Sequence, residues 1–214
     1  MSERKKKMRE ELPDFWSFNR PRDESLVKTE DLHWYGPFSW KDFEKTNKLE
    51  PLPDIAGVYL LTFEYKDGYI LRSVGVTNSM KRRFAQHTRE YLAGNYTILD
   101  VDYAKVGIRK EIWHGWGYAK EHRDEFLRYK NYIMSFIKKE LESYRIFITE
   151  VEDKRKRERI EFAIVQNIYS SKEPWANLID GGMTLRGRFN NEIPIEIRNI
   201  CSYKVYGLSE KLEI

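Results

Sequence analysis

The apolar positions of the chain repeat with two different periods, and each change of period marks a predicted element. Residues 57–65 are mostly β-branched, aromatic or aliphatic, which predicts a strand, and residues 66–68 carry a turn signal before a second strand at 69–76. The two strands are expected to form an antiparallel hairpin. A third strand is predicted at 144–151, where apolar and polar residues alternate.

Three stretches with apolar residues spaced three or four apart predict helices. The first begins after Asn78 or Ser79, either of which can cap a helix, and ends near residues 94–95. The second covers about residues 120–143, and the third follows Asp153, whose side chain can cap it. Together these elements predict an α+β fold in which helices flank a small, mainly antiparallel sheet made of the hairpin and the later strand.

The remaining segments divide the chain into a central unit and two ends. Residues 1–50 are expected to form an arm and an aromatic-rich cover, because residues 32–40 hold four aromatic side chains that can lie over a sheet face. The central unit spans residues 51–180, with an inserted strand and helix segment at about 96–143. Residues 181–214 are expected to form a C-terminal extension that packs back on this unit.

Composition fits a globular, intracellular protein. At 214 residues the chain has room for one domain with appendages, and 41% hydrophobic residues are enough for a packed core. No apolar run is long enough to span a bilayer, and residues 1–12 lack the apolar centre of a signal peptide. Cys201 is the only cysteine, which excludes an intramolecular disulfide and argues against a cysteine-based zinc site.

Basic residues cluster although the net charge is only +4. The clusters lie at residues 4–9, 81–83, 154–159 and 186–188. Such runs are usually solvated faces, and acidic neighbours offset part of the charge here. Beside a phosphate-binding site they would instead contact nucleic acid, and the candidates for such contacts are Lys81, Arg82, Lys154 and Arg155.

Two tripeptides and a helix carry the most specific pattern in the chain. Gly57-Val58-Tyr59 and Ser73-Val74-Gly75 are separated by thirteen residues, and Arg83 and His87 follow, one helical turn apart. This order resembles the GIY-YIG nucleases, over about residues 53–180. In that family two short strands carry the two tripeptides, and the next helix presents an arginine and often a histidine toward a scissile phosphate. The chain departs from the family at Ser73, where the second tripeptide should begin with tyrosine.

The resemblance implies catalytic roles for three residues. Tyr59 matches the family's first tyrosine, which is thought to take a proton from water once a nearby cation has lowered its pKa. Arg83 lies eight residues after Gly75, at the offset of the family's catalytic arginine, and its planar fork can engage two phosphate oxygens. His87 shares its helix face and can donate to the same phosphate or stabilise the leaving oxygen. The alternative for Tyr59 is a strand tyrosine that fills the core.

The resemblance also implies a metal-binding glutamate on the last predicted helix, and Glu161 fits it. Part of its surroundings should be apolar, so an unpaired carboxylate would be costly there and a bound cation would remove that cost. The alternatives are a salt bridge from Glu161 to Arg157 or a neighbouring basic residue, and Glu158 as the ligand. Asn177 matches an asparagine that steadies the glutamate region in the family, although it could instead cap a turn.

Ser73 raises the question of what replaces the missing tyrosine. A serine oxygen falls several ångströms short of a tyrosine hydroxyl, so it cannot occupy the same place without a bridging water. Tyr69 is expected on the same strand face by the two-residue period, and Arg72 or Tyr103 are further candidates. Otherwise the activity would be weak.

Two functions follow from the resemblance. The first is a DNA endonuclease that depends on one divalent cation, Mg²⁺ or Mn²⁺, and acts on double-stranded or branched DNA, with Tyr59, Arg83, His87, Glu161 and Asn177 as its catalytic residues. The second is a nucleic-acid-binding or regulatory domain that keeps the fold but has lost turnover together with the second tyrosine. In this family, insertions such as residues 96–143 commonly build target recognition or cover the cleft.

Overall fold

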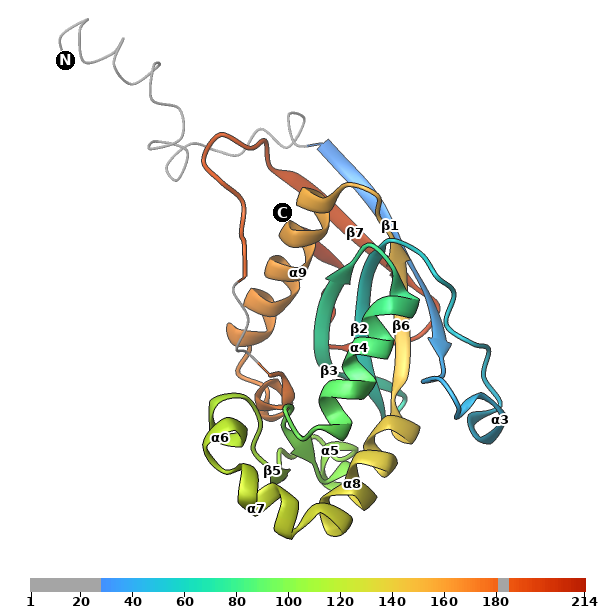
Figure 1. Cartoon of the computed structure of the whole chain (residues 1–214). Coiled ribbons are helices and arrows are strands. Elements are labelled where there is room, and N and C mark those ends of the chain that lie inside the picture. The colour runs from blue at the N-terminus through green and yellow to red at the C-terminus, as the bar shows by residue number, and fades with distance from the viewer. Residues whose placement is uncertain (1–27, 181–184) are drawn as a thin grey trace, which may run out of the picture.

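The computed structural model describes residues 28–180 and 185–214, and a curled seven-stranded sheet runs through them (Figure 1). The order of the strands across the sheet is β8-β3-β2-β6-β1-β7-β9. The strands are β1 (Lys28–Phe38), β2 (Gly57–Tyr65), β3 (Gly68–Thr77), β6 (Arg145–Glu150), β7 (Ile195–Cys201), β8 (Val205–Tyr206) and β9 (Lys211–Glu213).

The size and the mixed pairing of this sheet correct the prediction of a small, mainly antiparallel one. The β2–β3 hairpin and the β2–β6 pair are antiparallel as expected, but β1 pairs in parallel with β7, and β3 pairs in parallel with β8. Segments from both ends of the described chain therefore enlarge the sheet. Residues 1–27, which were expected to belong to the arm, lie outside the described residues.

The aromatic-rich segment 32–40 belongs largely to strand β1 and not to a cover over the sheet. Leu32 and Trp34 are buried while the residues beside them are exposed, which is the alternation of a strand with one face in the core. Trp40 follows the strand and is 1% exposed. It packs in the same cluster of buried residues as Tyr59, Leu61 and Phe63 of β2. Trp34 and Trp40 thus fill the interior, whereas Tyr35 is 59% exposed.

Helices cover both faces of the sheet (Figure 1). Their bounds are α3 (Glu44–Asn47), α4 (Met80–Leu92), α5 (Val101–Ala104), α6 (Trp116–Glu121), α7 (Arg123–Arg128), α8 (Lys130–Ser143), α9 (Lys154–Tyr169) and the 3-10 helix η3 (Pro174–Leu178). The helix predicted at 120–143 is therefore divided among α6, α7 and α8. A small sheet of β4 (Ile98–Leu99) and β5 (Glu111–Trp113) lies with α6, α7 and α8 at one end of the molecule, within the segment predicted to be an insertion.

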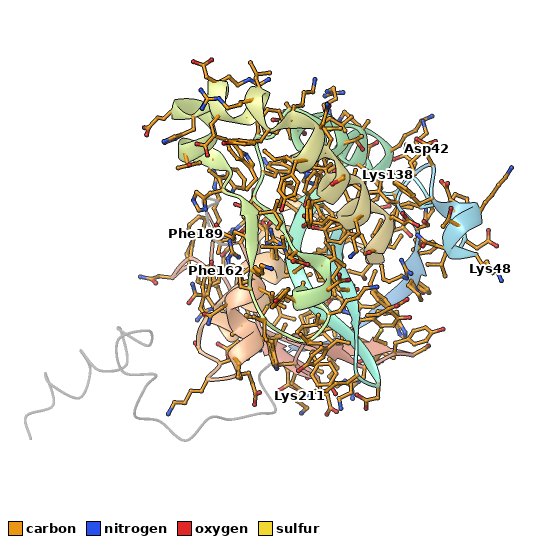
Figure 2. All side chains as sticks on the ribbon, turned by 90° about the horizontal axis from the view of Figure 1, so that it is seen from below. Asp42, Lys48, Lys138, Phe162, Phe189 and Lys211 are labelled. Atoms are coloured by element: carbon orange, nitrogen blue, oxygen red, sulfur yellow. The ribbon has the colours of Figure 1, made fainter. Side chains whose placement is uncertain are left out.

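Strand β2 is buried on both faces and separates two halves of the core. Tyr59, Leu61 and Phe63 point into the half that contains α4 and α8, while Val58 and Leu60 point into the half that contains α9. Figure 2 shows side chains filling the space between the elements. None of the helices in the described parts of the chain combines the length and the apolar character that crossing a bilayer requires.

Candidate functional site

Strand β2 places Tyr59 at the centre of the site, opposite Gly75 on β3. Only 1% of Tyr59 is exposed, and its ring lies across the backbone of Gly75. A Cβ atom at Gly75 would come within 2.2 Å of the Tyr59 hydroxyl, so any other residue at this position would displace the ring. The glycine of the second tripeptide therefore makes room for the tyrosine of the first.

Helix α4 brings Arg83 and His87 to the Tyr59 hydroxyl. Ser79 caps this helix by accepting a hydrogen bond from the backbone N–H of Arg82, and the one-turn spacing puts both side chains on the face toward the sheet. Arg83 Nε donates to the Tyr59 hydroxyl over 3.1 Å, and the same hydroxyl lies 2.6 Å from Nε2 of His87. The three predicted residues are thus brought together.

The donors and acceptors assign the proton positions of this cluster. The Tyr59 oxygen already accepts from Arg83, so its own proton is directed to Nε2 of His87, the other polar atom in contact with it. His87 Nε2 is then an acceptor, and its Nδ1–H donates to the hydroxyl of Tyr96, 3.1 Å away. His87 is 7% exposed and lies behind Tyr59, whereas the resemblance implied that it contacts the phosphate.

Burial dominates the proton equilibria of Tyr59 and His87. It raises the pKa of Tyr59 to about 12, although Arg83 acts in the opposite direction. Burial and the positive charge of Arg83 both lower the pKa of His87, to about 3. At neutral pH Tyr59 therefore keeps its proton and His87 is neutral. Arg83 does lower the pKa of Tyr59, as expected of a nearby cation, but burial raises this pKa by more.

Glu161 comes from α9 and lies within electrostatic range of Arg83 and Tyr59. It is 8% exposed, and among the described residues none donates a hydrogen bond to it or forms an ion pair with it. Burial raises the pKa of Glu161 to about 7, against the effect of Arg83. The alternative of a salt bridge to Arg157 is not realised, because Arg157 donates instead to the carbonyls of Val151 and Glu152 and to Asn78.

A single divalent cation at Glu161 would have to take most of its ligands from water or phosphate oxygens. The described residues contain no group of three or more His, Cys, Asp or Glu side chains that could hold a metal by themselves. Mg²⁺ commonly uses one or two carboxylates and completes its shell with water and phosphate oxygens. Glu158, the alternative ligand, is already engaged with Arg155 and lies near Lys154 and Arg186.

A basic cavity of about 230 Å³ opens between the end of β3, α4 and α9. Arg82, Arg83, Lys154 and Arg157 line it, and no carboxylate does. Two of the four predicted nucleic-acid contacts, Arg82 and Lys154, therefore line the same cavity as Arg83.

The other two predicted contacts lie differently. Lys81 is exposed, and only its backbone N–H is engaged, with Asp54. Arg155 forms an ion pair with Glu192 and covers the ring of Phe189, so its guanidinium stabilises the fold.

A second, smaller cavity of about 40 Å³ borders Tyr59 on the other side of Arg83. This volume has room for a water molecule but not for a nucleotide. The side chains around it include Tyr59, Ser73, Arg83, His87 and Tyr96. Ser73, where the resemblance expects a tyrosine, thus faces the same cavity as Tyr59, Arg83 and His87, the three residues called the catalytic cluster below for the role that the resemblance implies, and Tyr96 from the loop after α4 supplies a second phenol.

A β-bulge decides which residue accompanies Ser73. Ser73 pairs with Leu61 and Leu71 pairs with Thr62, so Arg72 is an extra residue in β3. The bulge lets Arg72 line the small cavity together with Ser73 and moves Tyr69 to the opposite face, where its ring contacts Phe147. Tyr103, the third candidate substitute, is 42% exposed beneath Lys110 and does not line the cavity.

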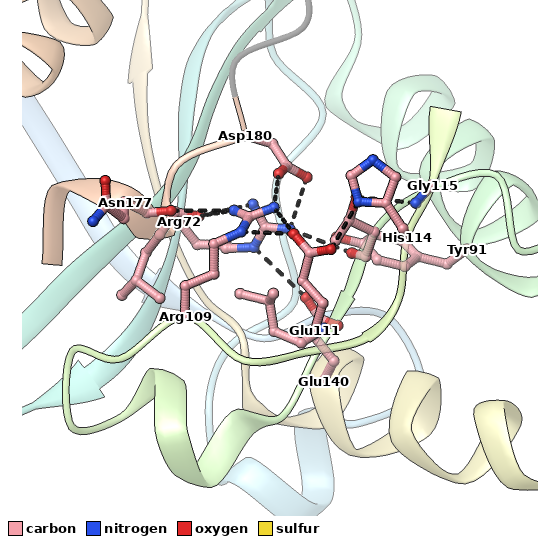
Figure 3. A network of polar contacts seen from close by, with 12 residues as sticks. Arg72, Tyr91, Arg109, Glu111, His114, Gly115, Glu140, Asn177 and Asp180 are labelled. Carbon is pink, nitrogen blue, oxygen red and sulfur yellow. Dashed lines mark hydrogen bonds and ion pairs between the residues drawn. The ribbon is translucent and has the colours of Figure 1, made fainter. Parts of the chain in front are cut away.

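Arg72 belongs to a buried ionic network that was not predicted (Figure 3). It is 2% exposed and donates to Asp180 over 2.8 Å, and its Nε lies 3.8 Å from Glu140 without a hydrogen-bond partner. Burial opposes its charge, but Asp180 and Glu140 more than compensate, so the pKa of Arg72 is raised. Asp180 also accepts from Arg109, which extends the network to the surface.

Asn177 lies apart from the catalytic cluster. It is exposed in η3, its main-chain carbonyl accepts from Arg109, and it lines a third cavity. No contact among the described residues joins its side chain to Glu161. The role that the resemblance implied for Asn177 therefore has no counterpart in the geometry.

Comparison with protein-family models, with curated proteins and with solved structures found no match to this chain. The functional conclusion therefore rests on the geometry of the site.

Proposed function

We propose that the protein is an intracellular endonuclease that hydrolyses phosphodiester bonds of DNA with the help of one divalent cation. One observation carries the proposal: the Tyr59 hydroxyl is held between Arg83 and His87, within electrostatic range of a buried carboxylate, Glu161, that has no partner among the described residues. A purely structural tyrosine would need neither the arginine nor the unpaired acid beside it.

The hydrogen bonds define a path for the proton of the attacking water. A water in the small cavity gives a proton to the Tyr59 oxygen while the phenol gives its own proton to Nε2 of His87. The water oxygen forms its bond to phosphorus, the bond to the leaving oxygen breaks, and that oxygen takes a proton from solvent. His87 afterwards returns its proton to solvent through Tyr59, which restores the starting state. Because Tyr59 receives one proton as it loses another, no free tyrosinate is required.

Arg83 connects the water to the phosphate, because it lines both the small cavity and the basic one. Its Nε is directed to Tyr59 and its Nη1 to Gln86, which leaves Nη2 for a phosphate oxygen. Glu161 would hold the cation, which when bound neutralises charge on the phosphate. Arg82 and Lys154 would contact neighbouring phosphates from the rim of the basic cavity.

The second candidate is a nucleic-acid-binding domain without turnover, and the proton equilibria favour it. A tyrosine with a pKa of about 12 next to a histidine with a pKa of about 3 is a weak base, and Ser73 supplies no second phenol from β3. The basic cavity serves both candidates equally. Tyr96, bound to His87, is the feature that favours the enzyme, because it occupies the same cavity as Ser73.

The test is cleavage of supercoiled plasmid and of branched DNA by the purified protein with Mg²⁺ or Mn²⁺. EDTA and the Glu161→Gln variant, which keeps the shape of the side chain but not its charge, should each abolish cutting. Glu161→Ala should do the same. Salt-sensitive binding without cutting would favour the binding domain, and cutting by Glu161→Gln at the wild-type rate would exclude Glu161 as the metal ligand.

A further inference from the structure

A cavity of about 510 Å³, larger than the two beside Arg83, adjoins the catalytic cluster and has no part in the proposed hydrolysis. It lies between the loop before α6, the end of α9 and η3, and its lining includes Trp116, Tyr169, Ile179 and Asp180. Trp116 and Asp180 also line the small cavity beside Tyr59. A ligand in the large cavity would therefore contact the same two side chains that border the attacking water.

Trp116 is held in a backbone conformation that a bulky residue rarely adopts. Its φ is 59°, in the left-handed region, and its side chain remains 40% exposed. Such strain persists only where the surroundings enforce it, and it clusters at binding and active sites. The conformation and the exposed part of the ring, which lines the cavity, therefore point to a function of Trp116 in addition to packing.

Contacts with the segment after α4 enforce the position of Trp116. Its backbone N–H donates to the carbonyl of Asn95 over 2.8 Å, and the N–H of Gly115 donates to the Thr97 hydroxyl over 3.1 Å. A Cβ atom at Gly115 would lie 2.4 Å from the backbone of Tyr96 and Thr97, so only glycine permits this approach. The indole in turn lies 5.3 Å from the ring of Tyr96, which binds His87. Trp116 is thus rigidly placed against the catalytic cluster.

The cavity offers hydrogen-bonding groups beside its aromatic surface. Asp180 and Arg109 form one edge and belong to the network around Arg72 (Figure 3). Tyr169, 49% exposed, adds a second aromatic ring, and Ile179 adds apolar surface. A flat aromatic ligand whose edge carries donors and acceptors matches this combination, and a nucleobase is such a ligand.

We propose that the large cavity receives an unpaired nucleobase next to the scissile phosphate, stacked on Trp116. The inference rests on the proposed function, because it takes the substrate to be nucleic acid bound in the basic cavity. In an intact duplex each base is paired and stacked, and extruding one is costly. The favoured substrate is therefore a single strand, a flap or a branch point, where a base is already free.

The experiment is a thermodynamic cycle between the tryptophan and the base, measured as binding in EDTA. A fluorescein-labelled single-stranded oligonucleotide is compared with a set in which an abasic site occupies each position in turn, which leaves every phosphate in place. For the wild-type protein one abasic position should weaken binding about tenfold. For Trp116→Ala the intact oligonucleotide should bind about tenfold more weakly, and the abasic site at that position should have no further effect.

Two variants control the cycle. Trp116→Phe keeps an aromatic ring and should retain most of the affinity and the abasic effect. Tyr132→Ala removes an exposed ring on α8 that lines neither cavity beside Tyr59, and it should behave as the wild type. Circular dichroism and thermal unfolding confirm that each variant is folded.

The outcomes separate this inference from the proposed function. Cleavage of branched DNA without an abasic effect, or abasic and Trp116→Ala effects that simply add, would overturn the nucleobase site and leave the nuclease intact. Coupling between Trp116 and one base, together with no cleavage, would support the site and refute the nuclease. Failure to bind any oligonucleotide would overturn both.

Discussion

The Tyr59 hydroxyl lies 2.6 Å from Nε2 of His87, and because Arg83 already donates to the same oxygen, we assign the hydroxyl proton to the hydrogen bond with His87. The relationship sets the order of events at the site. Both ring nitrogens of His87 are engaged, with Tyr59 and Tyr96, and in the proposed mechanism Tyr59 takes a proton from water only as His87 takes one from Tyr59. The two residues therefore have to be tested as one unit.

Tyr59→Phe should remove most of the activity while keeping the fold. The variant loses the oxygen that exchanges protons with water, and a positioned acid or base contributes about 10²–10⁴-fold to a rate. Loss of the hydroxyl also leaves Arg83 Nε and His87 Nε2 without a partner, which should cost about 1 kcal/mol of folding stability. Single-turnover cleavage and urea unfolding measure the two effects. Tyr103→Phe, an exposed tyrosine outside the site, is the control, and equal losses in both variants would refute the role of Tyr59.

Glu161 should make folding stability depend on pH in the absence of metal. Its pKa is raised from 4.5 to about 7 on folding, so the folded state binds the extra proton between these values. This contribution is full below pH 4.5 and is lost as the pH rises through about 7. Glu161→Gln should therefore be more stable than the wild type at pH 8 in EDTA, by on the order of 3 kcal/mol, and equal to it near pH 4.5.

Mg²⁺ should reverse the Glu161 effect. At pH 8 added Mg²⁺ should raise the unfolding midpoint of the wild type, because the cation binds the folded carboxylate, and leave Glu161→Gln unchanged. Glu140 has a raised pKa as well, but both proteins retain it, so the difference between them reports Glu161 alone. The same midpoint shift in Glu161→Gln would place the cation elsewhere.

Removing Asp180 should destabilise the protein strongly. Its carboxylate accepts from Arg72, which is 2% exposed, and from Arg109. Breaking a buried ion pair by removing one partner leaves an uncompensated charge and costs about 3–5 kcal/mol. Asp180→Asn should therefore lower the free energy of unfolding by about 3 kcal/mol in denaturant titrations. Asp67→Asn breaks the exposed pair with Lys204 and should change little; a similar loss there would remove the distinction between the two pairs.

At position 116, glycine should be more stable than alanine. The left-handed φ of 59° costs an alanine about 1 kcal/mol that glycine does not lose, so Trp116→Gly should exceed Trp116→Ala by about this amount. The order should be inverted at Lys120, an exposed residue within α6, where glycine is less favourable than alanine by about 1 kcal/mol. Thermal unfolding of the four variants tests both orders of stability. A Trp116→Ala variant that is more stable than Trp116→Gly would refute backbone strain at this position.

Substitutions in the basic cavity should weaken binding by a similar factor for every DNA sequence. Arg82→Ala and Lys154→Ala each remove one phosphate contact, so the slope of log K against log salt concentration should fall by about 1. Lys48→Ala, at the periphery of the molecule (Figure 2), should leave the slope unchanged. Fluorescence anisotropy over a salt series gives the slopes, and an unaltered slope in both cavity variants would exclude this hollow as the phosphate site.

Elements defined by local pattern could be predicted from the sequence, and so could the central cluster. The β2–β3 hairpin, α4 with its cap at Ser79, β6 and α9 with its cap at Asp153 are confirmed close to their expected bounds. Tyr59, Arg83 and His87 were grouped by the resemblance, and spacing predicted only that Arg83 and His87 share a helix face. The structure brings the three together through the pairing of Tyr59 with Gly75 and the short connection from β3 to α4.

Features that depend on distant pairing were not predictable in the same way. Lys28 pairs in parallel with Ile195, and no local sequence pattern links these two segments. The predicted sheet was therefore smaller than the observed one. The bulge at Arg72 shifts the two-residue alternation of β3, so Tyr69 lies on the face of the sheet opposite to Ser73. The pairing of Arg72 with Asp180 links residues 108 positions apart, and an arginine within a strand gives no hint of such a partner.

The parallel pairing of β1 with β7 has a consequence for synthesis on the ribosome. Residues 28–38 emerge early, but their partner strand at residues 195–201 is made only after the whole catalytic cluster has been translated. Until then one edge of β1 is open, and its apolar residues Leu32 and Trp34 lack their cover from the C-terminal strands. A nascent chain that pauses after α9 would therefore carry the hairpin together with an unpaired strand edge. Such an edge is prone to aggregation, which chaperone binding would prevent.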